Sequence, residues 1–388
     1  MKISNKINLS FFVVASLIAI TASFSFYTMA RDSLQKLIRD NLAISVAARA
    51  RQVETYLDSL STVTVLAAKN PVLGNALAPV AIIKDKKKQQ QQISDILRQA
   101  NAGLVAMQSA DPDIAEFMLL DATGKVVAAA NNSSIGQTKA GESYFLLGKK
   151  DAYLSDIYFS AEVGAPVLTA AVPLFGTSSQ FIGMLAAHFS LDGLNAIMTD
   201  TTGLGKTGEI YLVNQFGYMV SPSRFMPDAV LKQLVDSENL KRSLARAGKE
   251  TVMPEGIYSD AFLNYRGAEV FGDNEYIPRM SWSVLAEMET SEAFAPLVKL
   301  QLVLLLILLL APLAAWLLGE AISRTISRPL HRLYQGVEII NSGNLDYRIN
   351  SKAKDEVGEL ARAFDTLAQN LKKSGGLKKV KKPAGKKS

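Results

Sequence analysis

The sequence contains no cysteine and only two histidines, His188 and His331, among 388 residues. The absence of cysteine excludes disulfides, thiolate metal ligands and a cysteine nucleophile. The two histidines are far apart in the sequence, so a histidine-based metal cluster is not expected either. We therefore expect no metal, no cofactor and no catalytic residues in this chain.

Charge is missing from two long runs. Ile7 to Ala30 is 24 residues without a charged side chain, and Leu300 to Gly319 is a second such run. About 20 apolar residues cross the hydrocarbon core of a bilayer as a helix, so both runs predict transmembrane helices. A cleaved signal peptide is the alternative for the first run, but its apolar core would be shorter, about 7–15 residues. Thr28-Met-Ala30 is also a poor cleavage site, which favours an uncleaved anchor.

The formal charge of +6 is unevenly distributed, because both ends of the chain are basic and the middle is not. Lys2 and Lys6 precede the first apolar run, and Arg324, Arg328 and Arg332 follow the second. Cytoplasmic flanks of membrane helices are enriched in Lys and Arg. We therefore predict two passes, with both termini cytoplasmic and residues 31–298 outside the membrane. Two buried helices of a soluble protein are the less favoured alternative.

The predicted external region changes from helical to strand-like patterning. Residues 31–70 show helical spacing of apolar residues, and 84–92 (KDKKKQQQQ) predict an exposed loop. Two hairpins are predicted about 90 residues apart, at 117–128 and 209–221. Further strands are predicted at 166–174, 181–190, 269–277 and 282–289, with a helix at 228–247. The fold class is therefore α+β, with two strand-rich units behind one long helix.

Several segments of this region resemble double Cache sensor domains. They are Tyr153-Leu-Ser-Asp-Ile-Tyr-Phe-Ser160, Ile182-Gly-Met-Leu-Ala-Ala187, Lys206-Thr-Gly-Glu-Ile-Tyr-Leu-Val-Asn214 and Trp282-Ser-Val-Leu-Ala-Glu-Met-Glu289. The resemblance implies tandem PAS-like modules on a long stalk helix, a distal module at about 100–195 and a proximal one at about 196–295. It also implies that the distal module is the ligand site.

The ligand-binding motif of the family's amino-acid-binding members is mostly altered here. Glu142 stands where they place an arginine, followed by Tyr144; Tyr158 is kept, Ser160 replaces its partner acid, and His188 replaces the acid that closes the pocket. An arginine fork holds a carboxylate with two hydrogen bonds, and that fork is missing. The resemblance therefore implies a site of Glu142, Tyr144, Tyr158, Ser160 and His188 that favours a cationic or neutral polar ligand. If His188 touches the ligand, binding should depend on pH near 6–7. A structural histidine is the equal alternative.

The segment after the second apolar run has two short apolar seams. One comprises Ile326, Leu330, Leu333, Val337 and Ile340, and the other Val357, Leu360, Phe364, Leu367 and Leu371. Both follow the spacing of coiled-coil contact positions. With Ser342-Gly-Asn-Leu-Asp-Tyr-Arg-Ile349 and Asp355-Glu-Val-Gly-Glu-Leu360, residues 320–372 resemble the HAMP relay of bacterial receptors. The resemblance implies a cytoplasmic parallel four-helix bundle in a homodimer.

These features predict the following organisation. The segments are a cytoplasmic N-terminus (1–6), a transmembrane helix (7–30), a double Cache sensor (31–298), a second transmembrane helix (299–319), a HAMP domain (320–372) and a basic tail (373–388). The tail holds seven lysines and is predicted to be disordered, in contact with anionic lipid or merely solvated. Expected partners are a small ligand, membrane lipid, a second copy and a cytoplasmic output protein in trans, but no nucleic acid.

The predicted function is a receptor in the bacterial inner membrane that binds a small molecule outside and relays the event through its HAMP domain. Two alternatives remain open. The chain could be the truncated front of a histidine kinase, nucleotide cyclase or chemoreceptor, which binds without output. A membrane-anchored external enzyme is the least favoured, because no convincing catalytic set is visible in the sequence.

Overall fold

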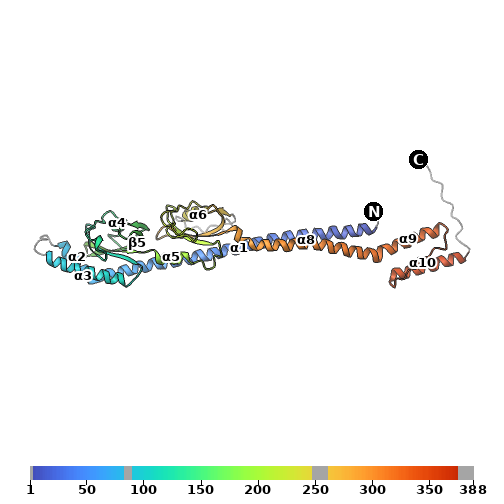
Figure 1. Cartoon of the computed structure of the whole chain (residues 1–388), viewed down its shortest axis with the longest axis horizontal. Coiled ribbons are helices and arrows are strands. Elements are labelled where there is room, and N and C mark those ends of the chain that lie inside the picture. Colours follow the sequence, from blue (N-terminus) through green and yellow to red (C-terminus); the bar gives the residue numbers. More distant parts are fainter. Residues whose placement is uncertain (1–2, 83–89, 247–260, 375–388) are drawn as a thin grey trace, which may run out of the picture. The chain divides into compact units, whose positions relative to one another are not determined.

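The computed structural model describes residues 3–82, 90–246 and 261–374, which form two compact units (Figure 1). One unit comprises Ser33–Phe294, and the other comprises Met1–Asp32 together with Ala295–Ser388. Helices and strands are mixed in the first unit, whereas the described part of the second is helical. The α+β class predicted from the sequence is confirmed.

Helix α1 runs without interruption over Ile3–Ala68. Its first half is the first apolar run, and its second half is the predicted stalk. In the stalk, Val53, Leu57 and Leu60 are buried at spacings of four and three residues, which places them on one face of the helix. That face packs into the main core of the Ser33–Phe294 unit. Helices α2 (Pro71–Ile82) and α3 (Gln90–Ser109) follow it.

The distal module is built on one antiparallel sheet with the order β2-β1-β6-β5-β3, and β4 pairs with β5. The strands are β1 (Ile114–Asp121), β2 (Val126–Ala129), β3 (Tyr153–Leu154), β4 (Tyr158–Ser160), β5 (Ala165–Phe175) and β6 (Phe181–Phe189). Short helices η1 (Asn132–Ser134) and α4 (Ser143–Leu147) lie between them in sequence, and α5 (Asp192–Thr199) follows β6. The strands expected at 166–174 and 181–190 are confirmed.

The proximal module has a four-stranded antiparallel sheet with the order β7-β10-β9-β8. Its elements are β7 (Glu209–Val213), α6 (Glu238–Arg246), β8 (Phe262–Leu263), β9 (Glu269–Ile277), β10 (Trp282–Glu289) and α7 (Thr290–Ala293). The Trp282 indole Nε1 donates to Asp156 Oδ1 at 2.8 Å, which ties this sheet to the loop between β3 and β4. Burial raises the pKa of that Asp156 carboxyl.

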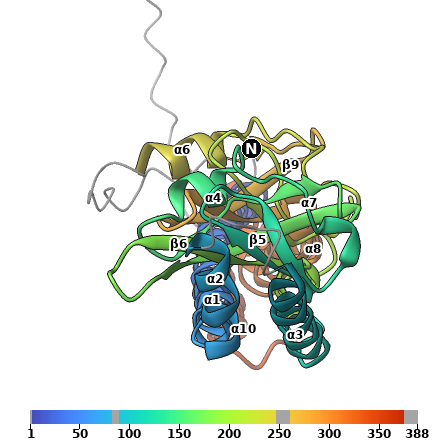
Figure 2. The same cartoon turned by 90° about the vertical axis from the view of Figure 1, so that its left-hand side faces the viewer.

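The two faces of the distal sheet have different roles. Phe117, Leu119 and Leu185 point to the face covered by α1, α2 and α3 (Figure 2). Met118 and Met184 point to the opposite face, where they pack with residues of α4. Side chains alternate between the faces of a strand, so polar residues at even positions of β1 and β6 lie on the α4 face.

In the other unit, the two apolar helical segments lie side by side. Helix α8 (Ala295–Ile322) contacts the start of α1, where Asn8 Nδ2 donates to Glu320 Oε2 at 3.1 Å and Gln301 Nε2 donates to Tyr27 Oη at 3.2 Å. Most of their large apolar side chains remain exposed. Both helices are long and apolar enough to cross a membrane.

A single turn of π-helix, Ser323–Ser327, joins α8 to α9 (Arg328–Asn341), and α10 (Glu356–Lys373) follows after a connector. The Asp355 side chain caps α10 by accepting from the Gly358 amide at 2.8 Å. The connector is held to α10 by Asp365, which accepts from the amides of Ile349 and Asn350. Both predicted seams therefore lie on helices.

Three local predictions are wrong or lie outside the described residues. The second arm of the 209–221 hairpin forms only isolated bridges, at Tyr218 and Met219. The helix expected over 228–247 begins only at Glu238, because Leu231 takes a left-handed conformation (φ 59°). Residues 90–92 of the expected 84–92 loop begin α3 instead. The rest of that loop and nearly all of the basic tail lie outside the described residues.

Candidate functional site

The candidate site lies on the α4 face of the distal sheet, where three polar residues are aligned across three strands. In the register, His188 on β6 is opposite Glu116 on β1 and opposite Thr169 on β5. Directly opposed residues of antiparallel strands point to the same face. All three side chains are buried, each at most 1% exposed. A row of polar groups therefore crosses an otherwise apolar sheet face.

Two tyrosines cover this row. The ring of Tyr144, from α4, lies 6.5 Å from that of Tyr158, from β4, in a nearly parallel arrangement. The His188 imidazole meets both rings edge-on, with centroid distances of 6.0 and 6.2 Å. Burial raises the pKa of both tyrosine hydroxyls, so both rings stay neutral. Three of the predicted site residues are thus brought together.

A chain of hydrogen bonds runs through the row. The Tyr158 hydroxyl lies 2.8 Å from the Thr169 hydroxyl, which lies 2.7 Å from Nδ1 of His188. Burial, and then the charge of Lys139, lowers the pKa of His188 to about 4. The imidazole is therefore neutral at physiological pH, and the expected titration near pH 6–7 is wrong for this unliganded site.

Two further groups bring charge to the site. Lys139 and Glu162 form a largely buried ion pair, and the Ser160 hydroxyl donates to Glu162 Oε2 at 3.0 Å. The pKa of Glu162 is lowered, because the bonds from Lys139 and Ser160 outweigh its partial burial. The predicted residue Ser160 is thus buried next to an acid that sequence reasoning did not select.

Glu116 is the most unusual member of the site. Neither of its carboxylate oxygens makes a hydrogen bond of ordinary geometry within the described part of the chain, although the buried Ser134 hydroxyl is beside it. Burial raises the pKa of this carboxyl. A buried polar group without a partner costs about 1–3 kcal/mol, so its retention indicates a role beyond packing.

Glu142, the remaining predicted residue, precedes α4 and is half-buried. Its side chain makes no cap bond to α4, but its negative charge is close enough to raise the pKa values of Tyr144 and Tyr158. Glu142 therefore lies at the rim of the aromatic pair rather than in the buried row.

Sequence reasoning missed Glu116, Lys139, Glu162 and Thr169. For Glu116 there was a signal, because a carboxylate at an inward position of the apolar run Ile114–Leu120 is unexpected in a core strand. Lys139 and Glu162 lie in loops without periodicity, so no pattern could have indicated that they pair.

The geometry suits recognition rather than catalysis. Thr169 and His188 resemble a nucleophile and its base, but both are completely buried and Thr169 already contacts Tyr158. Among the described residues, no group of three or more potential ligands could hold a metal ion. The aromatic pair, the free Glu116 carboxylate and the rim acid form a set of acceptors and ring faces.

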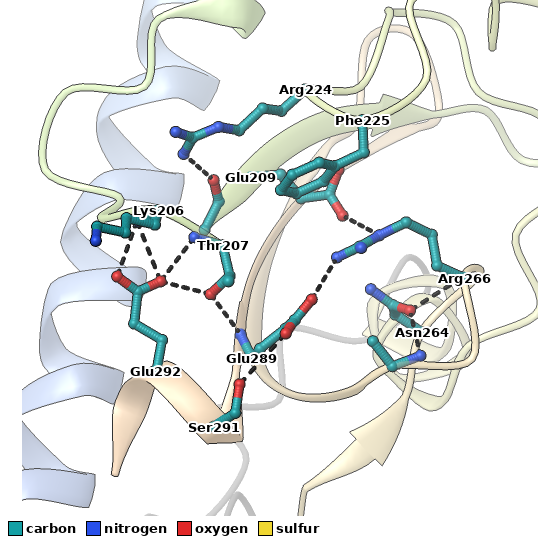
Figure 3. Close-up of polar contacts among 12 residues, drawn as sticks. Lys206, Thr207, Glu209, Arg224, Phe225, Asn264, Arg266, Glu289, Ser291 and Glu292 are labelled. Carbon is teal, nitrogen blue, oxygen red and sulfur yellow. Dashed lines mark hydrogen bonds and ion pairs between the residues drawn. The ribbon is translucent and has the colours of Figure 1, made fainter. Parts of the chain in front are cut away.

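A second polar network lies in the proximal module (Figure 3). Arg266 contacts Glu289 at 3.2 Å and Glu209 at 3.5 Å, and its guanidinium lies 4.1 Å from the centre of the Phe225 ring. Nearby, the Glu292 carboxylate accepts from the backbone amides of Lys206 and Thr207. This network was not predicted from the sequence.

The chain matches two family models: the Cache domain model dCache_1 over residues 30–297 and the HAMP domain model over residues 321–373. Methyl-accepting chemotaxis protein McpA of Pseudomonas putida is 26% identical over 218 residues, covering 55% of this chain and 32% of that protein. The Streptomyces coelicolor histidine kinase AfsQ2 is 38% identical over 61 residues, covering 16% and 11%. The chain thus spans a third or less of the length of these curated relatives.

Two solved structures are similar in their sensor domains. That of the Vibrio cholerae histidine kinase DctB has a TM-score of 0.49 at 14% identity, covering 67% of this chain and 98% of that one. That of the Campylobacter jejuni chemoreceptor Tlp3 has a TM-score of 0.48 at 12% identity, covering 69% and 99%.

The matched Cache model covers more than half of the chain, and neither matched domain is catalytic. Two apolar helices accompany these domains, which is the build of a membrane receptor with an external sensor domain. The chain therefore belongs to the Cache domain family and has the Cache-to-HAMP architecture of a signal-transduction receptor.

Proposed function

We propose that the chain binds a small cationic or neutral polar molecule in its distal Cache module and relays binding through its HAMP domain as a homodimer. The observation that carries this proposal is the buried, unpartnered Glu116 carboxylate beneath the rings of Tyr144 and Tyr158. A ligand that donates hydrogen bonds would satisfy it, and aromatic faces attract a cation by about 0.5–2 kcal/mol.

The charges near this site support the proposed ligand class. Glu116, Glu142 and Glu162 are acidic, while Lys139 is the base already paired with Glu162. A simple carboxylate ligand would meet net negative charge without an arginine fork to hold it. The site residues Glu142, Tyr144, Tyr158, Ser160 and His188 remain proposals, to which the geometry adds Glu116.

The proposed orientation rests on charge. Arginines follow the second apolar helix at 324, 328 and 332, and Lys2 and Lys6 precede the first. The enrichment of cytoplasmic flanks in basic residues would place both termini inside and the sensor outside an inner membrane.

The proposed homodimer is supported by apolar side chains left open on the HAMP helices. Leu330, Val337, Leu360 and Leu367 are 44–56% exposed in the single chain. They and their neighbours line a shallow apolar groove along α9 and α10. Helices this short and amphipathic gain their stability by packing, so a partner's pair of helices is the natural cover.

Two alternatives are separated from this proposal by output. A chain that binds ligand without a second protein to act on would be a receptor front without output. An external enzyme would turn its ligand over, whereas a receptor returns it unchanged.

The test is a thermal-shift screen of the full chain in lipid nanodiscs. The panel contains primary amines, diamines, neutral polar compounds, amino acids and short carboxylates. Ligand binding raises the melting temperature by mass action. We expect a shift from an amine or a neutral polar compound, and mass spectrometry of the recovered compound should show it intact. Tight binding of an acetate-like acid would overturn the charge argument.

Variants then localise the site. Tyr158→Phe and Glu142→Gln should each weaken binding of the compound found by about tenfold, because a hydrogen bond or charge contact to a buried ligand is lost. Glu54→Gln, a matched change at an exposed position of α1, should leave the affinity unchanged. Unchanged affinity in both site variants would place the ligand elsewhere.

A further inference from the structure

Two buried carboxylates oppose each other directly in the proximal module. Glu209 on β7 pairs with Glu287 on β10 in the antiparallel register, so both point to the same face of the sheet. Each residue is only 1% exposed. Like charges placed opposite each other destabilise a sheet, and removing them from water adds to that cost.

Several polar atoms around this pair have no partner in the part of the chain that the structure describes. They are both carboxylate oxygens of Glu287, Oε1 of Glu209, the Tyr211 hydroxyl and Nδ2 of Asn264. Tyr211 is completely buried on the same strand as Glu209, and its hydroxyl and the Asn264 amide are near enough to Glu287 to influence its ionisation. Native cores contain few such atoms, and five in one place indicate a missing partner.

The neighbouring groups do not supply that partner, because they are engaged elsewhere. Arg266 contacts Glu289 and only the edge of Glu209, at 3.5 Å, while it lies over the Phe225 ring (Figure 3). The Tyr265 hydroxyl donates to Oε2 of Glu209 at 2.9 Å, the oxygen that also accepts from Ser223. Glu287 is thus left without a cation.

We propose that the proximal module contains a second ligand site, centred on Glu287, Glu209 and Tyr211, for ammonium or a short primary amine. Four of the five free atoms can accept hydrogen bonds, so the ligand must be rich in N–H donors. A positive charge between the two carboxylates would remove their repulsion. The edge-on pair of Tyr211 and Tyr265, 5.4 Å apart, adds aromatic surface of the kind that attracts cations. The complete burial of Glu287 and Tyr211 limits the ligand to a small molecule.

This site is independent of the proposed distal site, because it lies on a different sheet and shares no residue with it. The experiment titrates the full chain in nanodiscs with methylammonium chloride, monitored by calorimetry and thermal shift. Tetramethylammonium chloride and potassium chloride at equal concentration serve as cations without N–H donors. We expect saturable binding of methylammonium alone. No binding of methylammonium, or an equal effect of potassium, would overturn the proposal.

The variants assign the binding to its place. Glu287→Gln removes a charge from a like-charged pair without changing size, so it should keep the fold and weaken methylammonium binding at least tenfold. Tyr211→Phe should weaken it several-fold. Glu238→Gln, an exposed change on α6 of the same module, should bind like the natural chain. Unchanged affinity in Glu287→Gln would refute the site.

Tyr158→Phe separates this proposal from the distal one. Methylammonium binding that survives in Tyr158→Phe supports the proximal site even if the distal screen finds nothing. Methylammonium binding that is lost in Tyr158→Phe but kept in Glu287→Gln would place the amine in the distal module and overturn the proximal site.

Discussion

The carboxylate of Glu292 is held by Thr207 through two hydrogen bonds, from the backbone amide and from the side-chain hydroxyl, each at 2.6 Å (Figure 3). The Lys206 amide adds a third bond at 2.8 Å. Gly205 lies so close that a side chain there would meet Glu292 Oε1 at 2.6 Å. Glu292 belongs to α7, which ends two residues before α8 begins. The loop before β7 is therefore fastened to the segment that leads into the second apolar helix.

Loss of this contact should loosen the loop. Partial burial tends to raise the pKa of Glu292, but the bonds from Thr207 and Lys206 lower it below its ordinary value, so the charged form is the one bound. Glu292→Gln removes the charge, and hydrogen bonds to charged groups contribute about 1.5–3 kcal/mol. We expect hydrogen exchange at the Lys206 and Thr207 amides to quicken by tenfold or more, measured by mass spectrometry. Glu238→Gln is the control, and protection equal to that of the natural chain would show that the contact is not stabilising.

The buried row of the distal sheet makes a second prediction. Thr169→Val keeps the shape of the side chain but leaves His188 Nδ1 and the Tyr158 hydroxyl without their shared partner. Stranding buried polar groups costs about 1–3 kcal/mol, so the melting temperature of the full chain should fall. Thr169→Ser retains the hydroxyl and should lose much less. Equal melting of the two variants would mean that the hydrogen-bond chain adds nothing to stability.

The HAMP seams can be tested by cross-linking, because the chain has no other cysteine. Cysteine at Leu330 or Leu367, both more than 40% exposed in the single chain, should form a disulfide with its own copy in membranes. Cysteine at the polar Gln369 of α10 should form less of it. A gel without reductant gives the dimer fraction. Equal cross-linking at all three positions would argue against a defined bundle.

Topology is testable with the same cysteine-free background. Single cysteines at Ser133 and Ser178, both exposed in the distal module, should react with a membrane-impermeant thiol reagent in intact cells. A cysteine at the exposed Ser342, after α9, should react only once the membrane is opened. Labelling of Ser342 alone in intact cells would reverse the orientation.

Regular elements were the most predictable part of this protein. The register of apolar residues gave β9 and β10 at their observed bounds, because a half-buried strand must alternate. The helix expected from Asp228 failed for a physical reason. Val230, Leu231 and Val235 have helix-like apolar spacing, but the Leu231 amide bonds to the Met219 carbonyl instead of a helical partner.

The functional groups were predictable only in part. Tyr144, Tyr158 and His188 were found through motif positions and are close together in the structure. Glu209 and Glu287 are 78 residues apart, and nothing local in either segment shows that they are opposed. That relationship depends on the register of β7 with β10, which is set by the fold as a whole.

Glu287 should make stability depend on pH. Burial, and then the charge of Glu209, raises its pKa to about 7, against an ordinary value of 4.5. The Tyr211 hydroxyl, the Asn264 amide and Arg266 lie around it and oppose this rise only in part. The folded chain thus keeps a proton that the unfolded chain releases between these two values. This contribution to stability is fully present below pH 4.5 and is lost as pH rises through 7.

Glu287→Gln has no such proton to lose. Relative to the natural chain, the variant should gain stability as pH rises from 5 to 8, by up to about 3 kcal/mol at 1.36 kcal/mol per pKa unit. Unfolding of the full chain in amine-free buffer at four pH values measures the difference. Glu238→Gln should differ from the natural chain by a constant amount. Saturating methylammonium should flatten the natural chain's profile, because a bound cation favours the charged carboxylate. A stability difference independent of pH would show that Glu287 titrates alike in the folded and unfolded states.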